Sequence, residues 1–327
     1  MSAPSTWTPI HAKVHQTLRS RQLLPRQRRL LIAVSGGQDS LCLAKLLLDL
    51  QPKWNWQVAI AHCDHRWRAD SAANTAHVQQ LAQTWQVEFY QRTTTQALPS
   101  EAAARTWRYQ ALTEMAQAYD YSCLVTGHTA SDRAETLLYN LMRGSGADGL
   151  QALTWQRALS PKINLVRPLL NLTRPETAQF CQVFNLPVWE DSTNQDLKYA
   201  RNRIRQELLP YLQQHFNPQA EKALAQATEL LQADVQYLEQ AAIALRQQAQ
   251  HPSQRGLNRL VLGSAPLALQ RRVVRQFLQA ALTKALNFEQ IEKVTNLITA
   301  PNRSQTDPFP GGAIAVVEGE WIWLKQL

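Results

Sequence analysis

The sequence predicts an open, mostly parallel, twisted α/β sheet with helices on both faces, followed by a smaller and mainly helical C-terminal domain. Short apolar runs alternate with helical stretches over the first two-thirds of the chain. Apolar runs separated by helices of this length are typical of parallel strands joined by right-handed crossovers. The later part has no glycine between Gly149 and Gly256 and is rich in Gln, Ala and Leu, which favours helices.

The α/β alternation can be followed in order along the chain. Each apolar run is expected to form a buried strand, and each stretch after it a helix packed on the sheet. In such a sheet, ligands bind beyond the carboxyl ends of the strands. The expected strands cover residues 30–34, 58–61, 87–90 and 124–126, and the expected helices cover 40–50, 71–85, 100–119 and 131–143.

The N-terminal segment is basic, with six lysine and arginine residues and no acidic residue before Asp39. An arginine-rich, acid-poor segment of this kind is typical of transit peptides. However, Ile10, Val14 and Leu18 follow helical spacing, and the first strand begins near Leu30, so little chain would remain to be cleaved. We therefore expect an amphipathic helix here, in a cytoplasmic protein.

Helical signals dominate beyond the fourth strand. Residues 173–176 form a capping box with a proline inside it, which marks the start of a helix. We expect two domains, a nucleotide-binding domain over 1–214 and a mainly helical domain over 215–327. The remaining expected elements are one or two long helices over 211–250, helices over 267–282 and 288–298, and a hairpin of 313–317 with 321–324.

Composition and charge narrow the classes of partner. The net charge of +9 and the pI of about 9.6 favour a polyanionic partner such as nucleic acid. No apolar run approaches the length needed to cross a bilayer, which excludes a membrane-spanning protein. Cys42, Cys63, Cys123 and Cys181 are widely spaced, so neither a disulfide framework nor a CxxC site is expected.

The hexapeptide SGGQDS, residues 35–40, lies between the first expected strand and the first expected helix. Gly36 and Gly37 permit a tight turn whose N–H groups converge on an anion at a helix N-terminus. Asp39 would be repelled by bare phosphate, so it fits beside Mg²⁺ or a hydroxyl group. The alternative is an ordinary Gly-Gly turn, but the complete hexapeptide after a buried strand favours a phosphate loop. No GxxxxGK[ST] loop is present.

Two further polar segments follow the second and fourth strands. His62 and Asp64, within His-Cys-Asp-His, could bind a metal, or Asp64 could accept from ribose hydroxyls or hold Mg²⁺. We disfavour zinc because no fourth ligand cluster accompanies them. After the fourth strand, Ser131 is expected to cap a helix, with Asp132 and Glu135 on neighbouring faces of its first turn. These two carboxylates could equally complement the helix dipole.

Two arginine-containing segments follow. Arg143 precedes a glycine-rich turn. Arg201 and Arg205 share a helical face and Arg203 lies off it. Arginines near polar and aromatic residues suit RNA phosphates and stacked bases, although a solvated basic helix is the alternative.

Together, these segments resemble the tRNA(Ile)-lysidine synthetase family of N-type ATP pyrophosphatases, whose SGGxDS loop holds pyrophosphate. The sequence departs from the family pattern at GHTASDR, where GHHADDQ is common, so Thr129 and Ser131 are not expected to be catalytic. The matching motifs span roughly residues 30–210 and are, in order, SGGQDS, HCDHRWR, EAAARTWRY, TGHTASDRAETLLYNLMRGSGADGL, RPLL and EDSTNQDLKYARNRIR.

The resemblance implies a two-step reaction on the wobble cytidine of the CAU anticodon of tRNA(Ile). ATP with Mg²⁺ adenylates the C2 oxygen and releases pyrophosphate, and the amine of free L-lysine then displaces AMP, changing decoding from AUG to AUA. The C-terminal domain is expected to read the tRNA body. Whether the chain forms a homodimer stays open.

The same resemblance suggests roles for individual residues. Two alternatives remain: tRNA cytidine 2-thiolation, whose families carry paired CxxC motifs or an iron–sulfur cluster, and a non-catalytic RNA-binding protein with a relic nucleotide loop. The expected catalytic residues are Asp39, Arg108, Asp132, Glu135 and Arg143. The residues expected to bind ATP are Ser35, Gly36, Gly37, Gln38, Asp39, Ser40, His62, Asp64, Gly127 and His128, and Asp39 is also the expected Mg²⁺ ligand. The residues expected to bind RNA are Arg201, Arg203 and Arg205.

Overall fold

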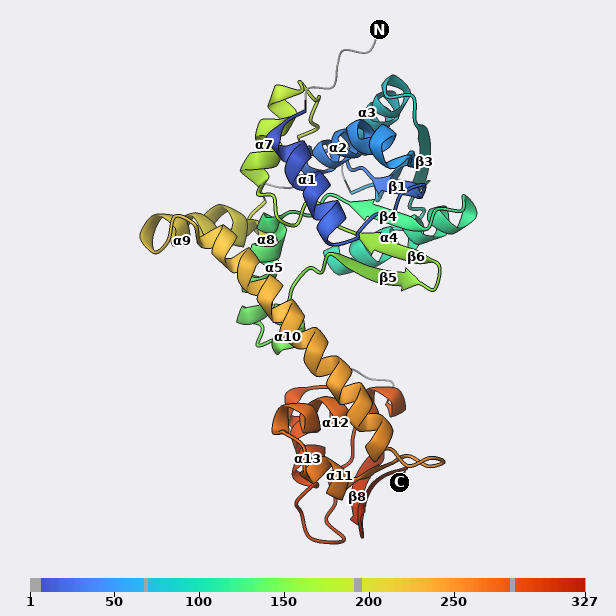
Figure 1. Ribbon diagram of the computed structural model, residues 1–327, viewed down its shortest axis with the longest axis vertical. Helices are drawn as coiled ribbons and strands as arrows, with labels where there is room; N and C mark the ends of the chain where they lie inside the picture. Colours follow the sequence, from blue (N-terminus) through green and yellow to red (C-terminus); the bar gives the residue numbers. More distant parts are fainter. Residues whose placement is uncertain (1–6, 68–69, 191–195, 283–285, 327) are drawn as a thin grey trace. The chain divides into compact units, whose positions relative to one another are not determined.

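The protein folds into two compact units, Met1–Leu230 and Leu231–Leu327. The division falls inside a long helix, α10 (Ala220–Ala249). The domain boundary predicted at residue 214 lies shortly before this helix and stays a prediction. The structure is a computed structural model that describes residues 7–67, 70–190, 196–282 and 286–326 (Figure 1).

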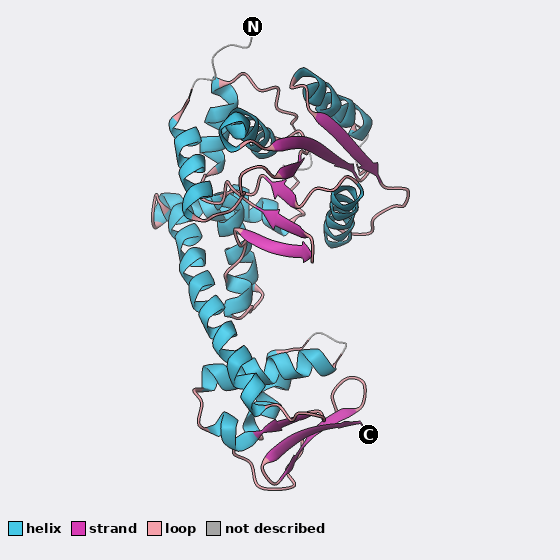
Figure 2. Ribbon diagram, turned by 45° about the vertical axis from the view of Figure 1, so that its right-hand side comes forward, coloured by secondary structure: helices cyan, strands magenta, loops and turns pink. Residues whose placement is uncertain are grey.

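The first unit is built on a sheet of six strands, β1 (Arg29–Ala33), β2 (Gln57–Asp64), β3 (Glu88–Thr93), β4 (Cys123–Thr126), β5 (Gln156–Ser160) and β6 (Ile163–Val166). Their order is β3-β2-β1-β4-β6-β5 (Figures 1 and 2). All neighbouring pairs are parallel except β5 and β6, which are antiparallel. The mostly parallel sheet predicted from the sequence is confirmed.

The strands β5 and β6 are not among those predicted from the sequence. β5 has no fully buried residue, and β6 has only four residues, of which Asn164 is exposed. β6 is nevertheless a strand because it pairs with β4, with Asn164 opposite Cys123. Both strands form because they pair with a neighbouring strand, and this pairing cannot be read from the local sequence.

Helices follow each of the first four strands, as the sequence predicts, and the expected amphipathic helix precedes β1. Val14 and Leu18 of that helix are buried. The capping box at residues 173–176 does begin a helix. The helices of the first unit before α10 are α1 (Pro9–Ser20), α2 (Gln38–Trp54), α3 (Ser71–Thr84), α4 (Glu101–Ala118), α5 (Ala130–Met142), α6 (Ala147–Leu150), α7 (Arg174–Val183), α8 (Ala200–Arg203), the π-helical turn η2 (Ile204–Leu208) and α9 (Leu209–His215).

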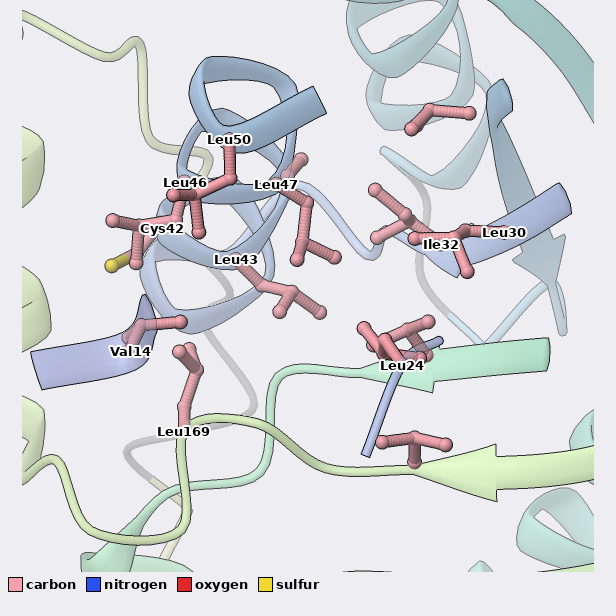
Figure 3. Close-up of a cluster of buried hydrophobic side chains, with 14 of the residues drawn as sticks. Val14, Leu24, Leu30, Ile32, Cys42, Leu43, Leu46, Leu47, Leu50 and Leu169 are labelled. Atoms are coloured by element: carbon pink, nitrogen blue, oxygen red, sulfur yellow. The ribbon is translucent and has the colours of Figure 1, made fainter. Parts of the chain in front are cut away.

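The two faces of the sheet are covered by different helices. Leu30 and Ile32 of β1 pack with α1, α2 and α7, whereas Leu31 between them packs with α4. This alternation is the period of two expected of a strand buried on both faces. Figure 3 shows leucines of α2, among them Leu43 and Leu47, in the cluster with Leu30 and Ile32.

The second unit pairs a three-stranded antiparallel sheet with helices. The predicted C-terminal hairpin is confirmed, and a third strand that the sequence does not predict joins its edge. No helix among the described residues is both long and apolar enough to cross a membrane. The sheet is β7 (Gly256–Asn258), β9 (Trp321–Gln326) and β8 (Ala313–Glu318) in that order, and the helices besides the later part of α10 are α11 (Arg259–Gly263), α12 (Leu267–Ala281) and α13 (Phe288–Asn296).

The beginning of α10 is anchored on the first unit by Glu229. Its carboxylate accepts from Arg133 Nη1 and Trp155 Nε1, both at 2.7 Å, and lies 2.6 Å from Arg21 Nη1. The side chain of Arg133 is only 3% exposed, so it depends on this partner. Burial acts to raise the pKa of Glu229, but the hydrogen bonds from Arg133 and Trp155 outweigh it and lower the pKa.

We expect Glu229→Gln to lower the free energy of unfolding of the first unit by about 2 kcal/mol, because a buried arginine loses its counter-charge. The folded-state pKa of Glu229 lies below its ordinary value of 4.5, so its stabilisation is complete above about pH 4.5 and is lost as the pH falls through the folded value. Urea unfolding followed by circular dichroism at pH 7 and in this acid range measures both effects. The exposed Glu114, changed to Gln, is the control and should change neither.

Candidate active site

The phosphate loop, residues 35–40, leaves β1 and enters α2. Gly36 has a φ of +90°, and a Cβ at this position would lie 2.6 Å from Asn74 Oδ1. The Ser40 hydroxyl donates to the Gly37 carbonyl at 2.8 Å and accepts from the Ser35 N–H at 3.2 Å. This closed turn precedes the positive end of the α2 dipole, where anions bind favourably.

Asp39, in the first turn of α2, is held from two sides. Its Oδ2 lies 3.2 Å from Arg174 Nη1, and its Oδ1 accepts from the Thr177 hydroxyl and from Gln38 Nε2. Burial raises the pKa of the Asp39 carboxyl; Arg174 opposes this rise and Asp132 adds to it. The charged form of Asp39 therefore depends on the guanidinium beside it.

The end of β2 brings His62 and Asp64 next to the loop. His62 Nδ1 donates to the Val34 carbonyl at 2.8 Å, which determines the tautomer of the ring. Asp64 Oδ1 accepts from the Arg66 N–H at 2.8 Å. No group of three His, Cys, Asp or Glu residues that could hold a metal occurs in the described part of the chain.

The N-cap of α5 is Thr129, and the cap expected at Ser131 is wrong because the helix begins at Ala130. The N–H and hydroxyl of Thr129 donate to Asp132 Oδ2 at 2.7 and 2.8 Å. One turn further, Glu135 accepts two hydrogen bonds from Arg205, at 2.6 and 2.9 Å. Both predicted carboxylates therefore also have structural partners.

The protonation of this cluster follows from its burial. Burial raises the pKa of Glu135, and Arg205 opposes the rise. Burial acts on Asp132 in the same sense, but the hydrogen bonds from Thr129 and the charge of Arg205 oppose it, and the pKa of Asp132 is lowered. Burial lowers the pKa of His128, so its ring is neutral near pH 7. The lowered pKa of Asp132 favours its ionised form, and its Oδ1 lies 3.8 Å from Arg205 Nη2.

A cavity of about 420 Å³ at the carboxyl edge of the sheet brings these elements together. Its wall includes the phosphate loop, the end of β2, the first turn of α5, α4 and the α8–η2 segment. These five segments, which are far apart in the sequence, therefore converge on one space. The predicted residues that line it are Ser35, Asp39, Ser40, His62, Asp64, Arg108, Gly127, His128, Asp132, Glu135, Arg201 and Arg205.

Two predicted arginines lie away from the cavity wall. Arg143 is exposed at the C-cap of α5 and donates to the Tyr139 hydroxyl at 3.1 Å. Because Arg143 lies 11 residues after Asp132, the two are about 16 Å apart along the helix axis. Arg203 is also exposed, off the face shared by Arg201 and Arg205 as the sequence predicts. The structure does not bring Arg143 together with the other predicted catalytic residues.

Three loop residues that were predicted to bind ATP act through the backbone or through neighbours. Gly36 and Gly37 form the turn itself and do not line the cavity. The Gln38 side chain donates to the Arg174 carbonyl at 3.0 Å and to the Thr177 hydroxyl at 3.1 Å, which ties the loop to α7.

Residues 191–195 of the EDSTNQ motif and Arg68 of HCDHRWR lie outside the described residues.

The cavity wall also has residues that are not predicted from the sequence, among them Arg174 and Tyr109. Arg174 lies in the capping box of α7. A capping box indicates where a helix starts, but it does not indicate which residue the Arg174 side chain contacts. The guanidinium groups of Arg105 and Arg157 lie 5.4 and 5.2 Å from the centroid of the Tyr109 ring. Burial acts to raise the pKa of Tyr109, but Arg105 and Arg167 outweigh it and lower the pKa. This side of the cavity is therefore positive.

Known proteins are similar in sequence over nearly the whole chain. The profile of the PP-loop domain matches residues 8–212, and that of the TilS substrate binding domain matches residues 257–323. A tRNA(Ile)-lysidine synthase from a Nostoc species is 67% identical, covering 98% of both chains, and one from a Synechocystis species is 53% identical, covering 97% of both. The chain belongs to the tRNA(Ile)-lysidine synthase family.

The resemblance to the tRNA(Ile)-lysidine synthase family that the motifs indicate is thus confirmed. Among solved structures, the U34-tRNA thiolase NcsA from Methanococcus maripaludis is similar in fold, with a TM-score of 0.55 and 16% identity. The match covers 68% of this chain and 77% of that one. At this identity, the likeness concerns the fold alone.

Two of the three positions at which the sequence departs from the common GHHADDQ pattern, Thr129 and Ser131, have defined places in the structure. Thr129 is the N-cap of α5. Ser131 is buried, its hydroxyl donates to Glu221 and its oxygen accepts from the Arg174 N–H at 2.9 Å. Neither lines the cavity.

Proposed function

We propose that the protein joins lysine to C2 of the wobble cytidine of tRNA(Ile), with ATP as the energy source, and so forms lysidine. The full-length similarity to proteins named tRNA(Ile)-lysidine synthase supports this activity. The convergence of the phosphate loop, the α5 carboxylates and the cationic α8–η2 segment on one cavity carries the proposal, because one reaction needs all three. The second unit, which matches a substrate binding domain, is proposed to bind the tRNA body.

In the first step, the C2 oxygen of cytosine attacks the α-phosphorus of ATP and pyrophosphate leaves. We assign the pyrophosphate to the turn at residues 35–40 and the N-terminus of α2, where backbone N–H groups and the hydroxyls of Ser35 and Ser40 can donate. Arg108 is assigned to the transferring phosphoryl group. His62 and Asp64, at the end of the neighbouring strand, are assigned to the adenosine.

A magnesium ion fits the donor set of this cavity. Mg²⁺ is usually held by one or two carboxylates together with substrate phosphates, so a cage of three protein ligands is not needed. Asp39 is the carboxylate of the phosphate loop itself, and burial and charge repulsion from Asp132 raise its pKa, which a cation would relieve. When bound, Mg²⁺ neutralises charge on the pyrophosphate leaving group.

In the second step, the ε-amine of lysine attacks C2 and AMP leaves. The amine has an ordinary pKa of about 10.4 and enters as an ammonium ion that must lose a proton. We assign the ammonium to Asp132 Oδ1, because both oxygens of Glu135 already accept from Arg205. The positive side of the cavity around Tyr109 suits the carboxylate of lysine or an RNA phosphate.

The test mixes the purified protein with ATP, Mg²⁺, labelled lysine and a tRNA(Ile) transcript that has a CAU anticodon. After digestion, mass spectrometry of the nucleosides is expected to find lysidine in place of one cytidine. The methionine tRNA with the same anticodon is the control and should stay unmodified. An unmodified cytidine in tRNA(Ile), with intact protein and bound ATP, would reject the proposed function.

The alternative of cytidine 2-thiolation is disfavoured by the thiols of this chain. Of the four cysteines, Cys63 alone lines the cavity. Burial raises the pKa of Cys63 to about 12, so its thiolate is scarce at neutral pH. A single protonated thiol is a poor sulfur carrier, whereas carboxylates that can hold an amine are present.

A further inference from the structure

A chain of hydrogen bonds links α10 to the phosphate loop. The Ser131 hydroxyl donates to Glu221 Oε1, in the first turn of α10. The same oxygen of Ser131 accepts from the backbone N–H of Arg174 at 2.9 Å, and the guanidinium of Arg174 lies 3.2 Å from Asp39. All four residues belong to the first compact unit. None of the bonds from Glu221 to Arg174 involves a residue assigned above to substrate.

Each bond in this chain restricts the next. Arg174 is the first residue of α7, so its N–H has no partner within the helix and needs an acceptor. The hydroxyl of Ser131 has one hydrogen and two lone pairs. When its hydrogen is directed to Glu221, its lone pairs are oriented toward other donors, and the Arg174 N–H uses one of them. Ser131 is only 4% exposed, so water does not readily take over either role.

The starts of α5 and α7 are also joined directly. The Ala130 N–H donates to the Leu172 carbonyl at 2.7 Å, just before the N-cap of α7. The contact of Arg133 with Glu229 provides a second tie between α5 and α10, eight residues beyond Glu221. Carboxylates of α10 thus bind the two residues on either side of Asp132. The first turn of α5 therefore contacts α10 at two points, and the start of α7 is joined to α5.

We propose that Glu221 and Ser131 are positioning residues that hold Arg174 against Asp39 and thereby set the phosphate loop for ATP. The inference rests on the proposed function, since the loop is taken to bind the pyrophosphate part of ATP. Asp39 is largely buried and its carboxylate depends on Arg174. Without the Glu221 carboxylate, the Ser131 hydroxyl loses the acceptor that orients its hydrogen, and the Arg174 N–H at the start of α7 loses a fixed acceptor.

The test compares Glu221→Ala, Ser131→Ala and the double variant with the unmodified full-length protein. The dissociation constant of a non-hydrolysable ATP analogue is measured by calorimetry, and KM for ATP and kcat are measured from pyrophosphate release on tRNA(Ile). We expect each single variant to raise the dissociation constant and KM about tenfold, and the double variant to match the singles because they break one chain. KM for lysine should not change.

Two matched variants separate positioning from general packing. Glu221→Gln keeps an oxygen that can accept from Ser131, so it should remain within about threefold of the unmodified protein. Gln213→Ala removes the other contact of Glu221, a 3.5 Å bond to its Oε2 that is not on the path to Asp39, and should change neither constant. A contact that only stabilises the fold would lower the melting temperature and leave ATP affinity of the folded protein unchanged.

The proposal is overturned if the Ser131→Ala variant binds the ATP analogue within twofold of the unmodified protein, or if the effects multiply in the double variant. If Glu221→Ala does not fold, the dissociation constants of the ATP analogue for Ser131→Ala and Glu221→Gln can be compared, and this comparison still tests the proposal. The binding measurement needs no turnover. A protein that binds ATP but makes no lysidine would therefore reject the proposed function and leave this comparison valid.

Discussion

Asp39→Asn is expected to lower the rate of tRNA-dependent pyrophosphate release by about 100- to 1,000-fold, the usual effect of removing one preorganised electrostatic group from a reacting centre. The amide has the shape of the carboxylate and can still accept from the Thr177 hydroxyl. It cannot neutralise Arg174, which lies 3.2 Å away, and it is a poor Mg²⁺ ligand. The folded structure should therefore persist while the first chemical step is lost.

Pyrophosphate release in the presence of tRNA(Ile) measures this directly, with circular dichroism as the check on folding. Asp234→Asn makes the same chemical change at an exposed position of α10 and should leave the rate unchanged. A well-folded Asp39→Asn protein that keeps more than about a tenth of the rate would remove Asp39 from the mechanism, because a group acting on the leaving pyrophosphate contributes more than that.

Gly127→Ala is the second substitution with a large expected effect. Gly127 follows β4, and a Cβ added there would lie 2.6 Å from the Asp39 carbonyl oxygen and 2.9 Å from its carbon. These are backbone atoms of the first turn of α2, which cannot move aside as a flexible side chain can. The loop after β4 must then separate from the phosphate loop, and a displacement of about 1 Å in a catalytic site costs about 100-fold in rate.

We expect Gly127→Ala to reduce lysidine formation by about 100-fold and to weaken binding of the ATP analogue, as measured by mass spectrometry and calorimetry. Gly146→Ala is the matched control, because its Cβ would meet nothing within 4 Å and its φ is negative. If both alanine variants formed lysidine and bound the ATP analogue equally well, the close approach of the loop after β4 to the phosphate loop would not be important for function.

The predicted site and the observed site differ in ways that follow from the residues concerned. Asp132 and Glu135 were predicted from their place in a first helical turn, and both line the cavity. Their separate roles were not predictable, because Arg205, which binds both oxygens of Glu135, is 70 residues away in the sequence. Arg143 was chosen because a glycine-rich turn follows it, a local signal that does not tell which end of α5 faces the cavity.

Local patterns in the sequence by themselves determined the first four parallel strands, the helices after them, the SGGQDS turn and the capping box of α7. Each depends on residues within a few positions of one another, so period and turn chemistry are sufficient. Only the tertiary structure decided that β5 and β6 complete the sheet, that Arg174 meets Asp39, and that Glu221 reaches Ser131. These pairings join segments distant in the chain, and they depend on how helices pack on the sheet, which no local periodicity encodes.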